Sequence, residues 1–320
     1  MASEFELIQR YFTRPAPSAV LGVGDDCALV KPRQGMLLAV STDMLVEGTH
    51  FLAGTDPRRL GHKALAVNLS DLAAMGADAR WALLSIALPA ADEAWIAAFA
   101  GGFLALAEST GVDIIGGDTT RGPLAMSVTV TGEVPPGLEL RRSGAQVGDD
   151  IWLSGSTGDA ALGLACLQGR IELPEDLRTA CCLRLECPEP RLELGGRLRG
   201  LASSAIDVSD GLAADIGHIA EASSVAADIY LDLLPRSSAL SSCTDTGLAQ
   251  QYLLGGGDDY ELAFTAPVAV RAQLDALAQE LQLPLTRIGV IQPGAPRVVV
   301  RGRDGVPVAV AHRGYDHFQP

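Results

Sequence analysis

Aspartates recur along this chain in short clusters beside Gly, Ser or Thr, and most of these clusters follow apolar, strand-like stretches. Mg²⁺ prefers several oxygen ligands and completes its shell with water and substrate phosphates, so carboxylates that arrive from separate loop ends suit this ion. Glycine lets the backbone approach closely enough for such side chains to converge. The pattern therefore predicts a site for metal and phosphate. The aspartates concerned are Asp25, Asp26, Asp43, Asp71, Asp118, Asp207, Asp210 and Asp258.

Most of these acids also have a simpler explanation when each is taken alone. A Gly-Asp-Asp string such as residues 24–26 is typical of a solvated turn, and Asp43 and Asp118 could be turn or loop residues at strand ends. Asp210 would be a good N-cap for the helix that follows it. Asp71 is harder to explain, because an acid near the C-terminal end of a helix opposes the macrodipole by roughly 0.3–1 kcal/mol.

Length and charge limit the possible functions. The chain has 320 residues and a formal net charge of −15, which favours two globular domains and argues against a nucleic-acid binder. Two bare like charges about 4 Å apart repel by roughly 4 kcal/mol at an effective dielectric constant near 20. An acidic protein that takes a polyphosphate therefore needs divalent cations to mediate the contact.

The sequence also predicts a cytoplasmic protein with no membrane association. Charged residues interrupt the N-terminal stretch where a signal peptide would need an apolar run, and the longest apolar run, residues 95–107, is too short to span a bilayer. The six cysteines show no zinc-ligand spacing, which favours reduced thiols.

Helix and strand signals alternate along the whole chain, which predicts an α/β (α+β) fold. Capping and periodicity indicate helices that begin near Ser3, Asp56 and Asp92, and Asn68 and Asp71 should share one side of the second helix. Strands are expected at 37–42, 82–88, 112–115 and 126–130. A Pro-Gly-rich linker then separates an N-terminal domain, residues 1–136, from a C-terminal α/β domain, residues 148–320.

Common nucleotide-binding signatures are missing. The chain has no P-loop, no dinucleotide-binding glycine motif and no protein-kinase motif. The Gly155–Gly158 turn could cradle a phosphate on its amides or could be only a tight turn. His50 has no neighbouring ligand in the sequence and taken alone suggests a surface position or a supporting one.

Read together and in order, the clusters resemble the thiamine-monophosphate kinase family, which shares a superfamily with aminoimidazole ribonucleotide synthetase and selenophosphate synthetase. The matching stretches cover nearly the whole chain. They are residues 22–28 (GVGDDCA), 41–51 (STDMLVEGTHF), 63–77 (KALAVNLSDLAAMGA), 115–123 (IGGDTTRGP), 142–145 (RSGA), 205–212 (AIDVSDGL), 255–262 (GGGDDYEL) and 314–318 (GYDHF).

The resemblance implies a two-domain subunit that forms a homodimer through its N-terminal sheet and binds several Mg²⁺ ions, ATP and thiamine monophosphate. The metal ligands would be Asp26, Ser41, Thr42, Asp43, Asp71, Asp118, Asp207 and Asp210. Gly117, Asp118, Arg142 and Ser209 would adjoin ATP, and His50, Asp258 and Tyr315 would contact thiamine monophosphate. The chain departs from the family at Asp258, where the usual residue is Glu.

The implied reaction is direct in-line transfer of the γ-phosphoryl group of ATP to thiamine monophosphate, which gives thiamine diphosphate. A phosphate monoester with a second pKa near 6 is largely a dianion at neutral pH, so no side chain is expected to act as a general base. Two alternatives stay open at this point: a related ATP-dependent synthetase of the same superfamily, and a non-catalytic protein that binds metal and nucleotide.

Overall fold

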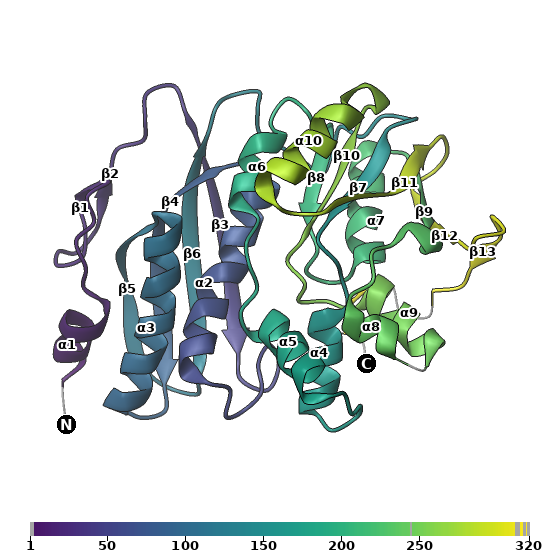
Figure 1. The fold of residues 1–320 in the computed structure, drawn as a ribbon. Helices are drawn as coiled ribbons and strands as arrows, with labels where there is room; N and C mark the ends of the chain where they lie inside the picture. Colours follow the sequence, from purple (N-terminus) through teal and green to yellow (C-terminus); the bar gives the residue numbers. More distant parts are fainter. Residues whose placement is uncertain (1–2, 244, 311–313, 316–317, 319–320) are drawn as a thin grey trace. The chain divides into compact units, whose positions relative to one another are not determined.

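The computed structural model describes residues 3–243, 245–310, 314–315 and 318, so Asp316 and His317 of the terminal motif lie outside the described residues. The chain forms two compact units. Unit 1 comprises Met1–Leu72 and Ala77–Glu139, and unit 2 comprises Ala73–Gly76 and Leu140–Pro320. Each unit combines helices with its own β-sheet (Figure 1), as the predicted α/β class requires.

Unit 1 is built on a four-stranded sheet in the order β3-β6-β4-β5, and a separate pair, β1 and β2, precedes it. In the main sheet β6 pairs antiparallel with both β3 and β4, and β5 pairs parallel with β4. The elements of this half of the chain are α1 (Glu4–Leu7), the π-helix η1 (Ile8–Phe12), β1 (Ala19–Leu21), β2 (Leu29–Val30), β3 (Leu37–Val46), α2 (Pro57–Ala74), β4 (Asp78–Leu88), α3 (Glu93–Thr110), β5 (Asp113–Arg121) and β6 (Ala125–Val134).

Helices α2 and α3 run side by side over one face of this sheet (Figure 1). Glycines permit their close approach, because a Cβ on Gly61 would lie 2.0 Å from the Phe99 carbonyl oxygen and a Cβ on Gly102 would lie 1.7 Å from the Arg58 carbonyl oxygen. The predicted helix starts are confirmed: Ser3 and Glu6 form a capping box, and Asp92 caps α3.

The other face of the sheet carries apolar side chains that solvent reaches. Alternate residues of a strand point to opposite faces, and on β3 this places Val40 and Met44 outward, 64% and 60% exposed. Leu83 of β4, which β6 separates from β3, is also exposed. We call this surface the open face of the sheet.

Unit 2 contains a seven-stranded sheet in the order β13-β12-β9-β11-β7-β10-β8, with β12 parallel to β9 and the other pairs antiparallel. Its elements are β7 (Asp150–Ser154), α4 (Asp159–Leu167), α5 (Glu175–Glu186), α6 (Leu192–Leu198), β8 (Ser204–Asp207), α7 (Leu212–Ser223), β9 (Ala226–Tyr230), η2 (Leu231–Leu233), α8 (Ser238–Ser242), α9 (Thr246–Gly255), β10 (Leu262–Ala266), η3 (Val268–Val270), α10 (Arg271–Leu281), β11 (Leu285–Gln292), β12 (Arg297–Arg301) and β13 (Pro307–Val308).

The central strands of unit 2 are buried on both faces, and alternate residues feed two apolar clusters. Ile151 and Leu153 pack in the cluster that holds residues of α4, α7 and α9, whereas Trp152 packs in the cluster that holds residues of α6 and α10. The period of two along a strand therefore divides the core into two layers. Among the described residues, no helix has the length and apolarity needed to cross a membrane.

Three local expectations were wrong. Asp43 is not a turn residue, because β3 continues through Val46, and Asp118 lies within β5, which continues to Arg121. Asp210 does not cap the next helix: the N-cap of α7 is Gly211, which has no side chain to offer. In the first two cases polar residues lie inside a strand, although in the sequence they suggest that the strand has ended.

Candidate functional site

Three of the predicted metal ligands gather on the helix-covered side of the sheet in unit 1. The hydroxyl of Ser41 on β3 donates a hydrogen bond to the carboxylate of Asp71 on α2. The backbone amide of Asp43 donates to Asn68 Oδ1 at 2.8 Å. Residues two apart on the strand therefore meet residues three apart on the helix, and the prediction that Asn68 and Asp71 share one side of α2 is confirmed. We call Ser41, Asp43 and Asp71 the helix-side group.

A second set lies on the open face of the same unit. A pocket of about 960 Å³ brings together Asp26, Gly117 and Asp118, and its lining includes Thr129. The Thr129 hydroxyl donates to Thr42 Oγ1 at 3.0 Å. Thr42 therefore lies beside this pocket, and the alternation of β3 separates its side chain from those of the helix-side group.

Gly117 shows why this pocket needs glycine. Its φ of 149° lies in the region that L side chains rarely adopt, and a Cβ there would lie 1.8 Å from the Leu84 carbonyl oxygen on β4. Asp118 follows immediately and pairs in register with Ser85. The close approach of β5 to β4 thus fixes the position from which Asp118 projects.

His50 has a local structural role. Its Nδ1 accepts a hydrogen bond from the Val46 amide at 3.0 Å, so the ring fastens the turn that ends β3. The nearly buried Lys63, 3% exposed, places its ammonium 3.5 Å from the His50 carbonyl oxygen. The contact of His50 with substrate stays a prediction.

In unit 2 the predicted ligands lie on the turn between β8 and α7, residues 207–211, which we call the acidic turn. Asp207 is the last residue of β8 and is 5% exposed, while Ser209 and Asp210 are half-buried. The backbone amides of Ser209, Asp210 and Gly211 all donate to Oδ2 of Asp215, at 3.1, 3.2 and 3.1 Å. Asp215 was not among the predicted site residues.

The structure also brings the predicted substrate segments onto this turn. The amide of Asp258 donates to the Ser209 carbonyl at 2.9 Å, and the amide of Tyr315 donates to the Asp210 carbonyl at 3.1 Å. Asp258 has a φ of 67° and lies in the segment that follows helix α9. Arg142 is not part of this group: its carbonyl accepts from Ser223, at the far end of α7.

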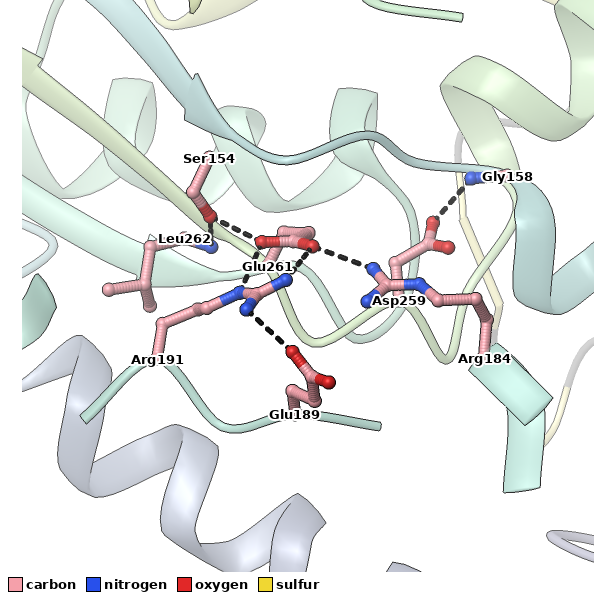
Figure 2. A network of polar contacts seen from close by, with 8 residues as sticks. All are labelled: Ser154, Gly158, Arg184, Glu189, Arg191, Asp259, Glu261 and Leu262. Carbon is pink, nitrogen blue, oxygen red and sulfur yellow. Dashed lines mark hydrogen bonds and ion pairs between the residues drawn. The ribbon is translucent and has the colours of Figure 1, made fainter. Parts of the chain in front are cut away.

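The segment that carries Asp258 continues into a buried ionic network around Glu261 (Figure 2). Glu261, 1% exposed, receives two hydrogen bonds from Arg191, at 2.6 and 2.7 Å, and one from Arg184 at 2.6 Å. The hydroxyl of Ser154 adds another at 2.5 Å.

The acid next to this network, Asp259, accepts from the Gly158 amide at 2.7 Å, while its Oδ1 is buried and has no hydrogen-bond partner among the described residues. Of the two roles open to the Gly155–Gly158 turn, the structure therefore favours structural anchoring, because the Gly158 amide is already used.

Burial perturbs the acids that hold these segments. It raises the pKa of Asp215 to about 7, and the neighbouring carboxylates of Asp207 and Asp210 contribute to the increase while the amide hydrogen bonds oppose it. Burial also raises the pKa of Asp259 well above its ordinary value. Both acids lie directly beside predicted site residues, as is common where charged groups have been gathered for binding.

The potential ligand atoms of each group suit a hard divalent cation. The helix-side group and the pocket on the open face offer carboxylate and hydroxyl oxygens, which Mg²⁺ prefers over sulfur or nitrogen. In unit 2, Asp210, Asp215 and His218 each place one potential ligand atom within 4.8 Å of the others. Ser41 and Asp71 are already close enough to share a hydrogen bond, so no rearrangement of β3 against α2 is needed to bring their oxygens together.

Sequence comparison assigns both halves of the chain to one group of proteins. Residues 24–134 match the N-terminal domain of AIR synthase related proteins, and residues 146–301 match the C-terminal domain. These two domains account for the predicted two-domain α/β architecture.

Similar proteins and structures narrow the group. The chain is 46% identical to thiamine-monophosphate kinase of Salmonella typhimurium (strain LT2) and 47% identical to that of Escherichia coli (strain K12), in each case over 98% of both chains. It resembles the crystal structure of thiamine-monophosphate kinase from Stenotrophomonas maltophilia K279a, with a TM-score of 0.86, 49% identity and coverage of 91% and 93%. It also resembles AaThiL complexed with AMPPCP and TMP, with a TM-score of 0.78, 32% identity and coverage of 90% and 89%. The chain therefore belongs to the thiamine-monophosphate kinase family of AIR synthase related proteins.

Proposed function

We propose that this chain transfers the γ-phosphoryl group of ATP to thiamine monophosphate and releases thiamine diphosphate and ADP. The observation that carries the proposal is the pocket of about 960 Å³ in unit 1, where Asp26, Gly117 and Asp118 come together. Its volume lies at the upper end of the range for small-molecule and cofactor sites. A relative of the same family, AaThiL, binds AMPPCP and TMP.

The metal ligands in this proposal are the oxygens of Asp26, Asp118, Asp207 and Asp210 together with the helix-side group. Thr42 keeps its predicted role through its position beside the pocket. When bound, Mg²⁺ ions neutralise the charge of the ATP phosphates and of the acceptor phosphate. Without Mg²⁺ these carboxylates would repel the phosphates of both substrates.

The protein needs to position two anions rather than to remove a proton. A terminal oxygen of the thiamine monophosphate dianion forms a bond to the γ-phosphorus, the bond from that phosphorus to the β,γ-bridging oxygen breaks, and ADP leaves with the electron pair. The acceptor is already largely deprotonated at neutral pH, since the second pKa of a phosphate monoester lies near 6. Attack in line with the leaving oxygen predicts inversion of configuration at phosphorus.

The predicted contact residues divide between the two substrates. Gly117, Arg142 and Ser209 are the proposed contacts with ATP. Asp258 and Tyr315 are the proposed contacts with thiamine monophosphate, and the hydrogen bonds of both amides to the acidic turn support a common binding region in unit 2. His50 adds a contact from the end of β3. ATP as co-substrate suits the cytoplasm as the site of this reaction.

We also infer that two copies of the chain associate through the open face of the sheet in unit 1. Val40, Met44 and Leu83 expose apolar area there, and association would remove this area from water. Val40→Glu with Met44→Glu should convert a dimer to a monomer in sedimentation equilibrium. A parent protein that sediments as a monomer would rule the inference out.

The assay that tests the function measures ADP and thiamine diphosphate together after incubation with ATP, Mg²⁺ and thiamine monophosphate. We expect one thiamine diphosphate for each ADP, and no product when Mg²⁺ is omitted. A related synthetase would release ADP and inorganic phosphate, and a non-catalytic binding protein would release no ADP. Either result would reject the proposal.

A further inference from the structure

The acidic turn has an unusual hydrogen-bonding pattern on its amide side. Three consecutive backbone amides, those of residues 209, 210 and 211, donate to a single oxygen, Oδ2 of Asp215. Asp215 is 2% exposed and lies in the first turn of α7. An acid at this depth is costly to bury, and hydrogen bonds from the backbone together with the helix N-terminus are what offset the cost.

The carbonyl side of the same turn is equally ordered. The carbonyl of Val208 accepts from the Tyr260 amide at 2.8 Å, that of Ser209 from Asp258 at 2.9 Å, and that of Asp210 from Tyr315 at 3.1 Å. Three consecutive carbonyls thus hold two separate segments of the chain. A Cβ on Gly257 would lie 2.5 Å from the Ser209 carbonyl oxygen, so only glycine lets the first of these segments approach.

We propose that Asp215 is a positioning residue that holds the acidic turn in the one conformation that serves ATP and thiamine monophosphate together. The inference rests on the proposed function and extends it. Asp215 fixes the direction of three peptide groups through their amides, and the carbonyls of this stretch in turn fix Asp258 and Tyr315. Displacement of the turn therefore alters the metal-bearing and the substrate-bearing segments at once.

Two other roles for Asp215 predict different behaviour. If Asp215 were a metal ligand together with Asp210 and His218, its replacement would weaken binding of Mg-ATP and leave the apo protein and the affinity for thiamine monophosphate unchanged. If Asp215 were purely structural, its replacement would lower the melting temperature without altering the kinetics of the folded enzyme. One of the two carboxylate oxygens of Asp215, Oδ2, already accepts three amides, which favours the positioning role.

The test compares Asp215→Asn and Asp215→Ala with the control Asp228→Ala in the full-length protein. Asn keeps one acceptor oxygen without its charge, and Ala removes it. Asp228 is a similarly buried acid, 6% exposed, that binds Arg301 on another part of the sheet. Hydrogen–deuterium exchange of the amides of residues 209–211 is measured without ligands, and the KM values for ATP and for thiamine monophosphate are measured on the folded fraction.

We expect Asp215→Ala to raise both KM values by about tenfold or more and Asp215→Asn to raise both by about threefold, because a neutral acceptor bonds more weakly than a charged one. In both variants exchange of the three amides should be faster by about tenfold. Asp228→Ala should change neither quantity. Should Asp215→Ala not fold, Asp215→Asn decides by the same two readouts.

Unchanged amide exchange, or a change in the KM for ATP alone, would overturn the positioning role. Loss of thermal stability with both KM values intact would overturn it as well. These outcomes differ from failure of the proposed function, which would appear as a parent protein that makes no thiamine diphosphate while the exchange of the three amides still depends on Asp215.

Discussion

The acidic loop of unit 1, residues 22–28, and the acidic turn of unit 2, residues 207–211, carry the same kind of side chains on very different supports. Asp25 and Asp26 are exposed, and a Cβ on the preceding Gly24 would have no neighbour within 4 Å. In the acidic turn, Asp207 is buried and the amides of three successive residues bind Asp215.

The contrast teaches that the two acidic segments are supported by different means. The acidic turn is set by hydrogen bonds that exist before any ligand arrives, so binding there requires little ordering. The loop in unit 1 presents its carboxylates to water, so under the proposed function the cations and phosphates would have to order it. We therefore expect binding energy to be spent on ordering mainly in unit 1.

The largest expected effect concerns the support of unit 2. Replacing Glu261 by Ala would leave the partly buried guanidinium groups of Arg184 and Arg191, 24% and 14% exposed, without their main anionic partner. Breaking a buried ion pair in this way costs about 3–5 kcal/mol of unfolding free energy. Chemical denaturation of the apo protein measures this loss.

The matched control is Glu280→Ala, which removes a bidentate pair with Arg197 at the surface. Solvent screens this pair, so the denaturation midpoint should move little. Equal destabilisation by the two substitutions would show that the Glu261 network does not support the segment more strongly than a surface pair does.

The next effect is on activity and arises in unit 1. Asp118→Asn should lower kcat by about hundredfold or more, because a charged ligand for the Mg²⁺ that neutralises the substrate phosphates becomes a neutral and weaker one. The melting temperature without ligands should stay close to that of the parent, since Asp118 is exposed on β5. Turnover within a few-fold of the parent at matched Mg²⁺ would remove Asp118 from the site.

Asp258 provides a smaller and more selective test. Asp258→Ala should raise the KM for thiamine monophosphate by about ten- to a hundredfold, which corresponds to roughly 1.5–3 kcal/mol for a hydrogen bond to a charged group, and leave the KM for ATP nearly unchanged. Asp258→Glu, which restores the usual family residue, should be tolerated. An equal effect on both substrates would assign position 258 to the metal site instead.

The smallest effect compares the two regions directly. Asp26→Asn and Asp207→Asn should both weaken Mg²⁺-dependent ATP binding. Without ligands, Asp26→Asn should leave the melting temperature unchanged, whereas Asp207→Asn should leave it unchanged or raise it, because it removes repulsion with Asp210 and Asp215. Thermal melts with and without Mg-ATP measure both effects. Destabilisation of the apo protein by Asp207→Asn would mean that this residue supports the fold.

The sequence predicted much of the framework, because caps and apolar periodicity are local signals. Helices α2 and α3 begin at Pro57 and Glu93, directly after the predicted starts at Asp56 and Asp92. Asp43 and Asp118 were misplaced as turn or loop residues because strands with a polar or solvent-exposed side do not keep an apolar pattern to their ends. Short strands such as β8, only Ser204–Asp207, leave too little pattern to detect.

Asp215 was missed for a different physical reason. On a helix its position suggests an ordinary polar residue, and nothing local indicates that its side chain turns back to three amides of the preceding turn. The signal in the sequence was an acid four residues after Gly211, in the first turn of the helix, where an acid is favourable in any case. Pairings between distant segments, such as Asp258 with Ser209, need the structure.

The central claim is that the site positions two anions and that no side chain acts as a base. The pH dependence of kcat tests it most directly. The rate should fall as the pH drops through the second pKa of the acceptor phosphate, near 6, because the monoanion is the poorer nucleophile. A phosphonate analogue of thiamine monophosphate, which has a higher second pKa, should move this limb to higher pH. A limb that stays at one pH for acceptors of different pKa would identify a titrating side chain of the enzyme and contradict the account.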